Sequence, residues 1–161
     1  MHCHYCGFQA PPPKNCPECQ SSYIRYFGIG TQRVQEELEE LLIAHPEMEF
    51  VQIQFNYLDD DKQATEEGLK AAGKAGVPLV IMEPLRGGKL VSRLPEEARR
   101  IFESHPVRYT PAQWAFRWLW NQKEVTCVLS GMNSGAMVRE KIETACTAQV
   151  GDLGENEEKM L

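Results

Sequence analysis

The chain has 161 residues, which suits one ordinary domain or a small module beside a modest one. Its formal net charge of −6 argues against non-specific nucleic-acid binding by the whole chain, and no apolar run approaches the roughly 20 residues that a membrane span needs. The N-terminus lacks the basic-then-apolar order of a signal peptide, so we expect a cytoplasmic protein.

Two Cys-x-x-Cys pairs stand near the N-terminus, Cys3 with Cys6 and Cys16 with Cys19, on either side of a proline-rich turn. Each pair can direct two thiolates at one centre, and two pairs complete a tetrahedral site for zinc. Two disulfides or uncoordinated thiols are the alternatives, and a reducing compartment disfavours the disulfides. We therefore predict a zinc-binding knuckle over residues 1–30, with these four cysteines as the metal ligands.

A connecting helix is predicted over residues 31–44. Thr31 can cap its first turn, and its apolar residues then fall on one helical face, namely Val34, Leu38, Leu41 and Leu42. The glutamates between residues 36 and 40 occupy the opposite side, where they are expected to be solvated.

The N-terminal motifs HCHYCGF, CPEC and YIRYFGIGTQRVQEELEELL resemble the zinc-binding insertion of the primosomal replication-restart DNA helicases. In that family eight cysteines hold two zinc ions in interleaved pairs, whereas only four cysteines are present here. The resemblance therefore implies a single re-formed zinc site. The chain has no P-loop, GxxxxGK[ST], so helicase activity is excluded. A nucleic-acid-binding zinc module is one alternative function, because basic and aromatic residues can stack on single strands: Tyr23, Arg25, Tyr26, Phe27 and Arg33.

Residues 50–88 predict a strand, a helix, a second strand and a glycine loop. Val51, Ile53 and Phe55 alternate with polar residues, the pattern of a strand with two different faces. An aspartate within 59–61 can cap the following helix, which ends at Gly76, and the apolar run 78–82 suits a buried parallel strand. This is a βαβ unit, and such sheets bind ligands at the carboxyl ends of their strands.

A further helix and strand follow the same plan. Thr110 and Gln113 flank a first-turn proline and form a capping box, and the aromatic face of that helix, with Trp114 and Trp118, is expected to be core. A strand is predicted from residue 125 to 129, and Ser134 caps a helix that continues to about residue 146. We expect the two remaining cysteines, Cys127 and Cys146, to be buried, and the acidic tail 151–161 to fray.

From residue 45 to 150, the motifs HPEMEFVQIQFNYLD, VPLVIMEPLRGGKL and YTPAQWAFRWLWNQKEVTCVLSGMNS resemble the C-terminal part of the aldo-keto reductases. That family is a (β/α)8 barrel that uses NADPH. The resemblance implies an α/β fold, a partial TIM-type barrel of about three strand-helix units. It follows the helicase-like segment without a spacer, so the chain reads as a chimera produced by a recombined, shuffled or misassembled coding sequence.

The resemblance also implies where NADPH would be bound. Gln52 matches the glutamine that hydrogen-bonds the nicotinamide carboxamide, and Met82 stands where many members stack an aromatic ring. The loop that starts at Glu83 would cover the pyrophosphate with Leu85, Arg86, Gly87 and Gly88. The adenosine end would be held by Ser130, Gly131, Met132, Asn133, Ser134, Glu140 and Lys141. Family members commonly carry Gln and Asn where Met137 and Lys141 stand, which weakens adenine recognition.

The family's catalytic Asp, Tyr, Lys and His all come from the half of the barrel that this sequence lacks. Tyr57 and Lys62 lie near one another in the sequence, but neither lies in the family's catalytic context. We therefore predict no catalytic residue and at most residual NADPH binding. The alternative is an NADPH-dependent oxidoreductase completed by oligomerisation or a partner.

An incomplete barrel also has open sheet edges, which favour self-association. Its inner face, expected to carry Ile53, Phe55, Val80 and Val128, would lack partner strands.

Overall fold

A computed structural model of the protein describes residues 31–59 and 66–161. The predicted zinc knuckle with its four cysteines, the capping aspartates at 60 and 61, and Lys62 lie outside the described residues. None of the helices within the described ranges is long and apolar enough to cross a membrane.

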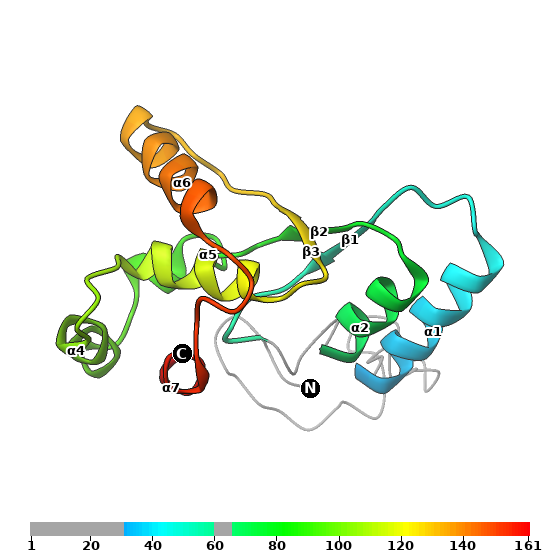
Figure 1. Ribbon diagram of the computed structural model, residues 1–161, viewed down its shortest axis with the longest axis horizontal. Coiled ribbons are helices and arrows are strands. Elements are labelled where there is room, and N and C mark those ends of the chain that lie inside the picture. The colour runs from blue at the N-terminus through cyan, green and yellow to red at the C-terminus, as the bar shows by residue number, and fades with distance from the viewer. Residues whose placement is uncertain (1–30, 60–65) are drawn as a thin grey trace, which may run out of the picture.

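Three short parallel strands form the sheet at the centre of the molecule (Figure 1): β1, Val51–Gln54; β2, Leu79–Met82; and β3, Val125–Val128. The strand order is β1-β2-β3, with Ile53 beside Ile81 and Ile81 beside Val128. The register shifts between Leu79 and Val80, where the Leu79 N–H donates to Thr126 Oγ1 at 3.2 Å. This arrangement confirms the predicted α/β fold with parallel βαβ connections.

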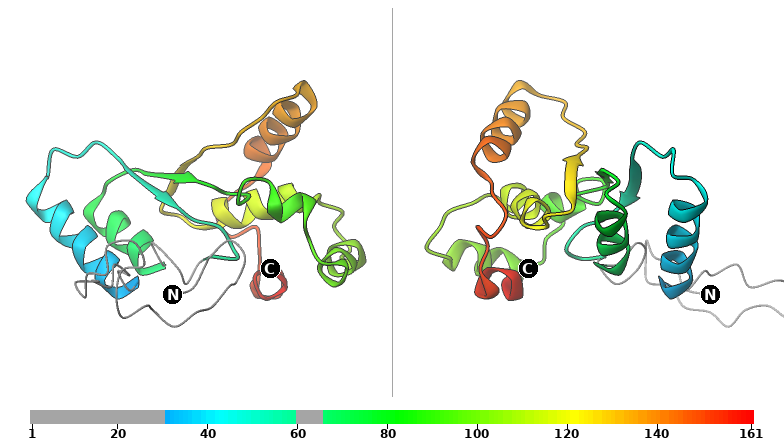
Figure 2. Two further views of the ribbon diagram at one scale, coloured as in Figure 1. Left: turned by 180° about the vertical axis from the view of Figure 1, so that it is seen from behind. Right: turned by 45° about the vertical axis from the view of Figure 1, so that its right-hand side comes forward.

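The described residues form seven helices besides the sheet. Figures 1 and 2 place α1 and α2 at one end of the molecule, and α4 and α6 at the other. Their bounds are Thr31–Ala44 for α1, Glu66–Ala75 for α2, Lys89–Ser92 for α3, Glu96–Ser104 for α4, Pro111–Asn121 for α5, Gly135–Thr147 for α6 and Glu155–Met160 for α7.

The helix boundaries follow from local sequence signals. Thr110 accepts a hydrogen bond from the Gln113 N–H while the Gln113 side chain accepts from the Thr110 N–H, which is the predicted capping box of α5. Ser134 caps α6 by accepting from the Met137 N–H. Gly76 follows α2 with a φ of 71°, a backbone conformation that residues other than glycine rarely adopt.

The hydrophobic core lies between one face of the sheet and helices α2 and α5. Trp114 and Trp118 of α5 are buried as predicted, and Trp118 stacks on Phe55 with ring centroids 5.1 Å apart. Leu69 and Ala72 of α2 complete the same cluster. Burial of large aromatic rings stabilises the fold through the apolar area that they remove from water.

The two sheet faces differ from the expected assignment. Ile53, Phe55 and Val128 pack against the helices and not on the face that a closed barrel would enclose. The opposite, open face carries Gln52, Val80 and Cys127, which are register neighbours across the three strands. The predicted face was therefore wrong for Ile53, Phe55 and Val128, because alternation separates two faces without indicating which one the helices cover.

The prediction that Cys127 and Cys146 are buried was also wrong, since both are exposed. Cys127 lies on β3, an edge strand of the described sheet, and on its open face. In α6 only Lys141 and Thr144 are buried, and Cys146 lies off that narrow contact stripe.

The acidic tail, expected to fray, contains α7 and packs against the core. Leu153 is only 6% exposed. Asn121 fixes its backbone by accepting from the Gly151 and Leu153 N–H groups and donating to the Leu153 carbonyl. Polar side chains of α5, Asn121 and Arg117, therefore help to order the tail, since Arg117 also pairs with Asp152. These partners lie outside the tail, which explains why the tail's own composition did not predict this.

Candidate functional site

A cavity of about 870 Å³ lies at the carboxyl ends of β2 and β3. It is bounded by the loop after β2, the start of α5, the loop after β3 and the first half of α6. Many of the predicted cofactor residues line this one cavity, namely Met82, Glu83, Leu85, Gly87, Gly88, Ser130, Gly131, Met132, Glu140 and Lys141. Segments almost 60 residues apart in the chain thus meet at the sheet edge where α/β proteins bind ligands.

The glycine loop after β2 adopts a backbone that depends on its two glycines. Gly87 and Gly88 have φ values of 64° and 80°, and Gly88 leads directly into α3. Glu83 and Arg86 also have positive φ values, which are uncommon for residues with a side chain. The loop therefore places glycine backbone beside the cavity in a locally strained conformation, as often happens at ligand-binding sites.

A buried asparagine, Asn56, holds this loop in place. Its Nδ2 donates to the Glu83 carbonyl at 3.3 Å, and its Oδ1 accepts from the Leu58 and Asp59 N–H groups at 3.1 Å each. Sequence reasoning noted Asn56 only as a polar residue in an alternating strand. Its position directly after the strand, followed by aspartates, is the signal that could have identified a turn-forming asparagine.

Three of the predicted residues lie around the cavity without lining it. Gln52 lies on the open face of the sheet, and its Nε2 donates to Met82 Sδ at 3.3 Å. Gln52 therefore contacts a residue that lines the cavity. Asn133 and Ser134 belong to the loop before α6, where Ser134 caps the helix.

Arg86 points away from the cavity. Its Nε lies 3.0 Å from Asp59 Oδ2, and its side chain lines a second cavity of about 440 Å³ beside Lys89 and Arg93. The glycine loop therefore presents backbone to the first cavity while its arginine faces the other side of the loop.

At the far end of the cavity, Glu140 joins α6 to α5. Its Oε1 accepts from Thr110 Oγ1 at 2.7 Å, and its Oε2 lies 2.6 Å from Lys141 Nζ. Burial alone would raise the pKa of Glu140, but the hydrogen bonds from Lys141 and Thr110 outweigh it and lower that pKa. Lys141 also lies over the Phe116 ring, 5.0 Å from its centroid. Sequence reasoning did not identify Thr110 as a residue of this site.

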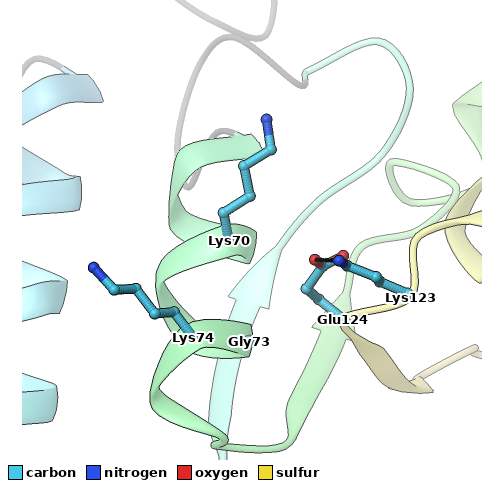
Figure 3. Close-up of a pocket in the computed structure, with 5 residues that line it drawn as sticks. All are labelled: Lys70, Gly73, Lys74, Lys123 and Glu124. Atoms are coloured by element: carbon cyan, nitrogen blue, oxygen red, sulfur yellow. Dashed lines mark ion pairs between the residues drawn. The ribbon is translucent and has the colours of Figure 1, made fainter.

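A third cavity, of about 450 Å³, lies between α2 and the turn before β3. Figure 3 shows Lys70 and Lys74 extending from α2, with Lys123 and Glu124 on the turn. Gly73 permits the close packing of these two segments, because a Cβ there would lie 2.6 Å from Glu124 Cγ. None of the predicted site residues lines this cavity.

Within residues 31–59 and 66–161, no group of three or more His, Cys, Asp or Glu side chains could hold a metal ion. The predicted zinc ligands lie outside these ranges.

Tyr57 lines the second cavity, and its ring meets Trp118 edge-on at 6.4 Å. Its hydroxyl is buried and makes no hydrogen bond within the described part of the chain. Burial raises the pKa of Tyr57 from the ordinary 10 to about 12. The folded state thus favours the neutral phenol, the opposite of the lowered pKa that a tyrosine proton donor requires near neutral pH.

Replacing Tyr57 with phenylalanine is expected to flatten the alkaline pH dependence of stability. Between pH 10 and about 12 the unfolded wild-type chain loses the Tyr57 proton before the folded one, so its free energy of unfolding falls as pH rises through that window. Urea unfolding of both proteins from pH 8 to pH 12 measures this difference. A wild-type curve that stays parallel to that of Tyr57→Phe across the window would contradict the burial of this hydroxyl.

The model of the Aldo/keto reductase family matches residues 19–149. Among solved structures, the chain is similar to the aldo-keto reductase AKR11C1 from Bacillus halodurans. In the apo form the TM-score is 0.57 at 18% identity, over 76% of this chain and 46% of that one. In the holo form the TM-score is 0.55 at 17% identity, over 81% and 52%. At this identity the likeness establishes the fold, and the chain spans about half the length of those structures.

The N-terminal quarter of the chain matches a second kind of protein. It is 60% identical over 42 residues to the replication restart protein PriA of Bacillus subtilis, and 53% identical over 38 residues to that of Synechocystis. These segments cover 26% and 24% of this chain, and 5% of each of those proteins. One chain is therefore similar to two different kinds of protein, as its motifs predicted.

Proposed function

Because the chain belongs to the Aldo/keto reductase family, we propose that its large cavity binds a nicotinamide dinucleotide weakly and that the isolated chain does not reduce a carbonyl. The chain would then retain the cofactor-binding loops of the family and lack the residues that transfer a proton to the substrate. The expected ligand is NADPH or a close relative, held across the ends of β2 and β3.

One observation carries this proposal: a single cavity is lined by residues from both loops that the family resemblance assigns to the cofactor. Gly87 and Gly88 offer backbone N–H groups on one side, as phosphate binding requires. Met132 and Met137 offer apolar surface on the other, which suits a flat heterocycle.

The proposed lack of turnover rests on the side chains around the cavity. Among the described residues, its lining contains no tyrosine or histidine, and its one lysine, Lys141, is paired with Glu140 at 2.6 Å. Tyr57 lines a different cavity and holds its proton more tightly than usual. The described lining therefore lacks a tyrosine that could donate a proton to a developing alkoxide, and this supports the proposed lack of carbonyl reduction.

Titrating the protein into NADPH is expected to change the nicotinamide fluorescence with a dissociation constant in the micromolar to millimolar range. Gly131→Trp should weaken binding by roughly tenfold or more, because that side chain would occupy the cavity, where nothing lies within 4 Å of the added Cβ. Gly135→Trp is the matched control: it is just as open but does not line the cavity. A flat titration of the wild type, or equal weakening by both variants, would overturn the proposal.

Mixing the protein with NADPH and an aldehyde should give no protein-dependent loss of absorbance at 340 nm. Turnover whose specific rate rises with protein concentration would instead favour the alternative, an oxidoreductase completed by association of several copies. Turnover at a constant specific rate would contradict the proposed lack of catalysis in the isolated chain.

A second function is supported by the N-terminal likeness to PriA together with the two Cys-x-x-Cys pairs. We propose that Cys3, Cys6, Cys16 and Cys19 bind one zinc ion, because four thiolates in two such pairs match the tetrahedral preference of zinc. Such a knuckle could serve a structural role or contact nucleic acid, and a salt-dependent shift with single-stranded DNA would support the latter.

Metal analysis of the purified chain is expected to find about one zinc per chain, and close to none in Cys16→Ser. The double variant Cys127→Ser, Cys146→Ser removes two exposed cysteines that belong to neither pair, and it should keep its zinc. Zinc-free wild type, or equal zinc loss in the control, would contradict this assignment.

A further inference from the structure

We infer that the large cavity disfavours a phosphate on the adenosine ribose and takes NADH at least as tightly as NADPH. This inference rests on the proposed dinucleotide binding and concerns its selectivity. The two ligands differ only in the 2′-phosphate, which adds a charge of about −1.5 to −2 at neutral pH.

The charges that line the cavity do not suit an additional anion. Within the described part of the chain, its ionisable lining residues are Glu83, Glu140 and Lys141, which give a formal charge of −1 when all three are ionised. Hydrogen bonds from Lys141 and Thr110 lower the pKa of Glu140 and keep that carboxylate charged. The net negative charge of the lining would therefore repel an additional anion such as the 2′-phosphate.

Lys141, the only cation among the described lining residues, is already paired. Lys141 Nζ lies 2.6 Å from Glu140 Oε2, and its charge also faces the Phe116 ring at 5.0 Å. To bind a phosphate, Lys141 would have to leave a partly buried carboxylate, whose own hydrogen bonding would then be incomplete. Lys141 thus balances Glu140 and does not act as a phosphate ligand.

The arginine of the glycine loop does not change this balance. Arg86 pairs with Asp59 at 3.0 Å and lines the second cavity, on the other side of its loop. A bidentate guanidinium is the group best suited to hold a phosphate, and the described residues that line this cavity include no arginine.

The first turn of α6 adds only a weak attraction. Its dipole favours any nearby phosphate, but this effect is small at exposed positions and is screened by salt. The Met137 N–H already donates to Ser134 Oγ at 3.3 Å. The pyrophosphate, which NADH and NADPH share, can use the remaining attraction equally in both ligands.

Parallel fluorescence titrations with NADH and NADPH, each at low and at high ionic strength, test the inference. We expect NADPH to bind no more tightly than NADH, and its relative affinity to rise as salt screens the repulsion. A site built from phosphate-binding cations would behave in the opposite way, with NADPH favoured at low salt and its advantage lost at high salt.

A pair of charge-neutralising variants in α6 sharpens the test. Glu140→Gln removes a carboxylate from the cavity and frees Lys141, so the affinity for NADPH relative to that for NADH should rise about fivefold. Glu143→Gln makes the same change in net charge on an exposed residue of α6 outside the cavity lining, and it should leave both affinities unchanged. NADH binding in each variant also reports that the cavity has kept its shape.

The outcomes separate this inference from the proposed function. NADPH that binds at least tenfold more tightly than NADH would leave dinucleotide binding standing and overturn the selectivity. An equal response to Glu140→Gln and Glu143→Gln would also overturn it, because the local carboxylate would then have no role. If neither ligand binds, the proposed function fails and the inference fails with it.

Discussion

Replacing Trp114 with alanine is expected to lower the free energy of unfolding by about 3–5 kcal/mol. The side chain is only 1% exposed and is surrounded by rings: Phe102 stacks on it at 6.3 Å, while His105 and Tyr109 each meet it edge-on at 4.9 Å. Alanine would leave a cavity at the junction of α4, α5 and the segment that joins them, and such rigid surroundings collapse only partly.

Urea unfolding followed by circular dichroism measures this loss, and Trp114→Phe is the matched control. The Trp114 Nε1 is buried without a hydrogen-bond partner in the described part of the chain. Phenylalanine therefore removes volume together with an unsatisfied donor, and its cost should stay below about 2 kcal/mol. An alanine variant no less stable than the phenylalanine variant would show that Trp114 is not a central core residue.

Asp152→Asn is expected to lower the free energy of unfolding by about 1–3 kcal/mol, because it leaves the Arg117 guanidinium buried without its counter-ion. The Arg117 side chain is 8% exposed and Asp152 is 37% exposed, so water screens part of this loss. Nη1 of Arg117 lies 3.3 Å from Asp152 Oδ2, its Nη2 donates to Thr147 Oγ1 at 2.6 Å, and the guanidinium lies 4.3 Å from the Tyr109 ring centroid.

Arg117→Met separates the charge effect from packing. It removes the buried cation and keeps an apolar chain of similar length, so it should destabilise the protein less than Asp152→Asn does. Both variants are compared by urea unfolding at pH 7. If Arg117→Met were the more damaging of the two, the arginine would act chiefly through its contacts with Tyr109 and Thr147.

Features encoded by neighbouring residues could be predicted from the sequence. The capping box at Thr110, the cap at Ser134 and the helix end at Gly76 each depend on a few consecutive residues, and all three are present in the structure. The strand-helix-strand unit and the loops that border the cavity belong to the same class, because the order of elements in an α/β sheet fixes which ends meet.

Features that depend on distant partners could not be predicted. Whether Ile53 faces helices or a barrel interior depends on which helices pack on the sheet, and the direction of Arg86 depends on Asp59 across a loop. The exposure of Cys127 follows from its place on the open face of β3, which no described helix covers. The ordering of the tail depends on Asn121, about 30 residues earlier.

The open face of the sheet has a consequence for how such a chain can arise. A barrel lining of large aliphatic residues would aggregate once cut from its partner strands, but here Gln52 and Gln54 alternate along β1 on that face. Water can solvate these amides, so this segment carries little penalty when it is separated from its original context. A barrel segment with such a lining can therefore stand beside a sequence of another family, as it does in this chain, without new residues on that face.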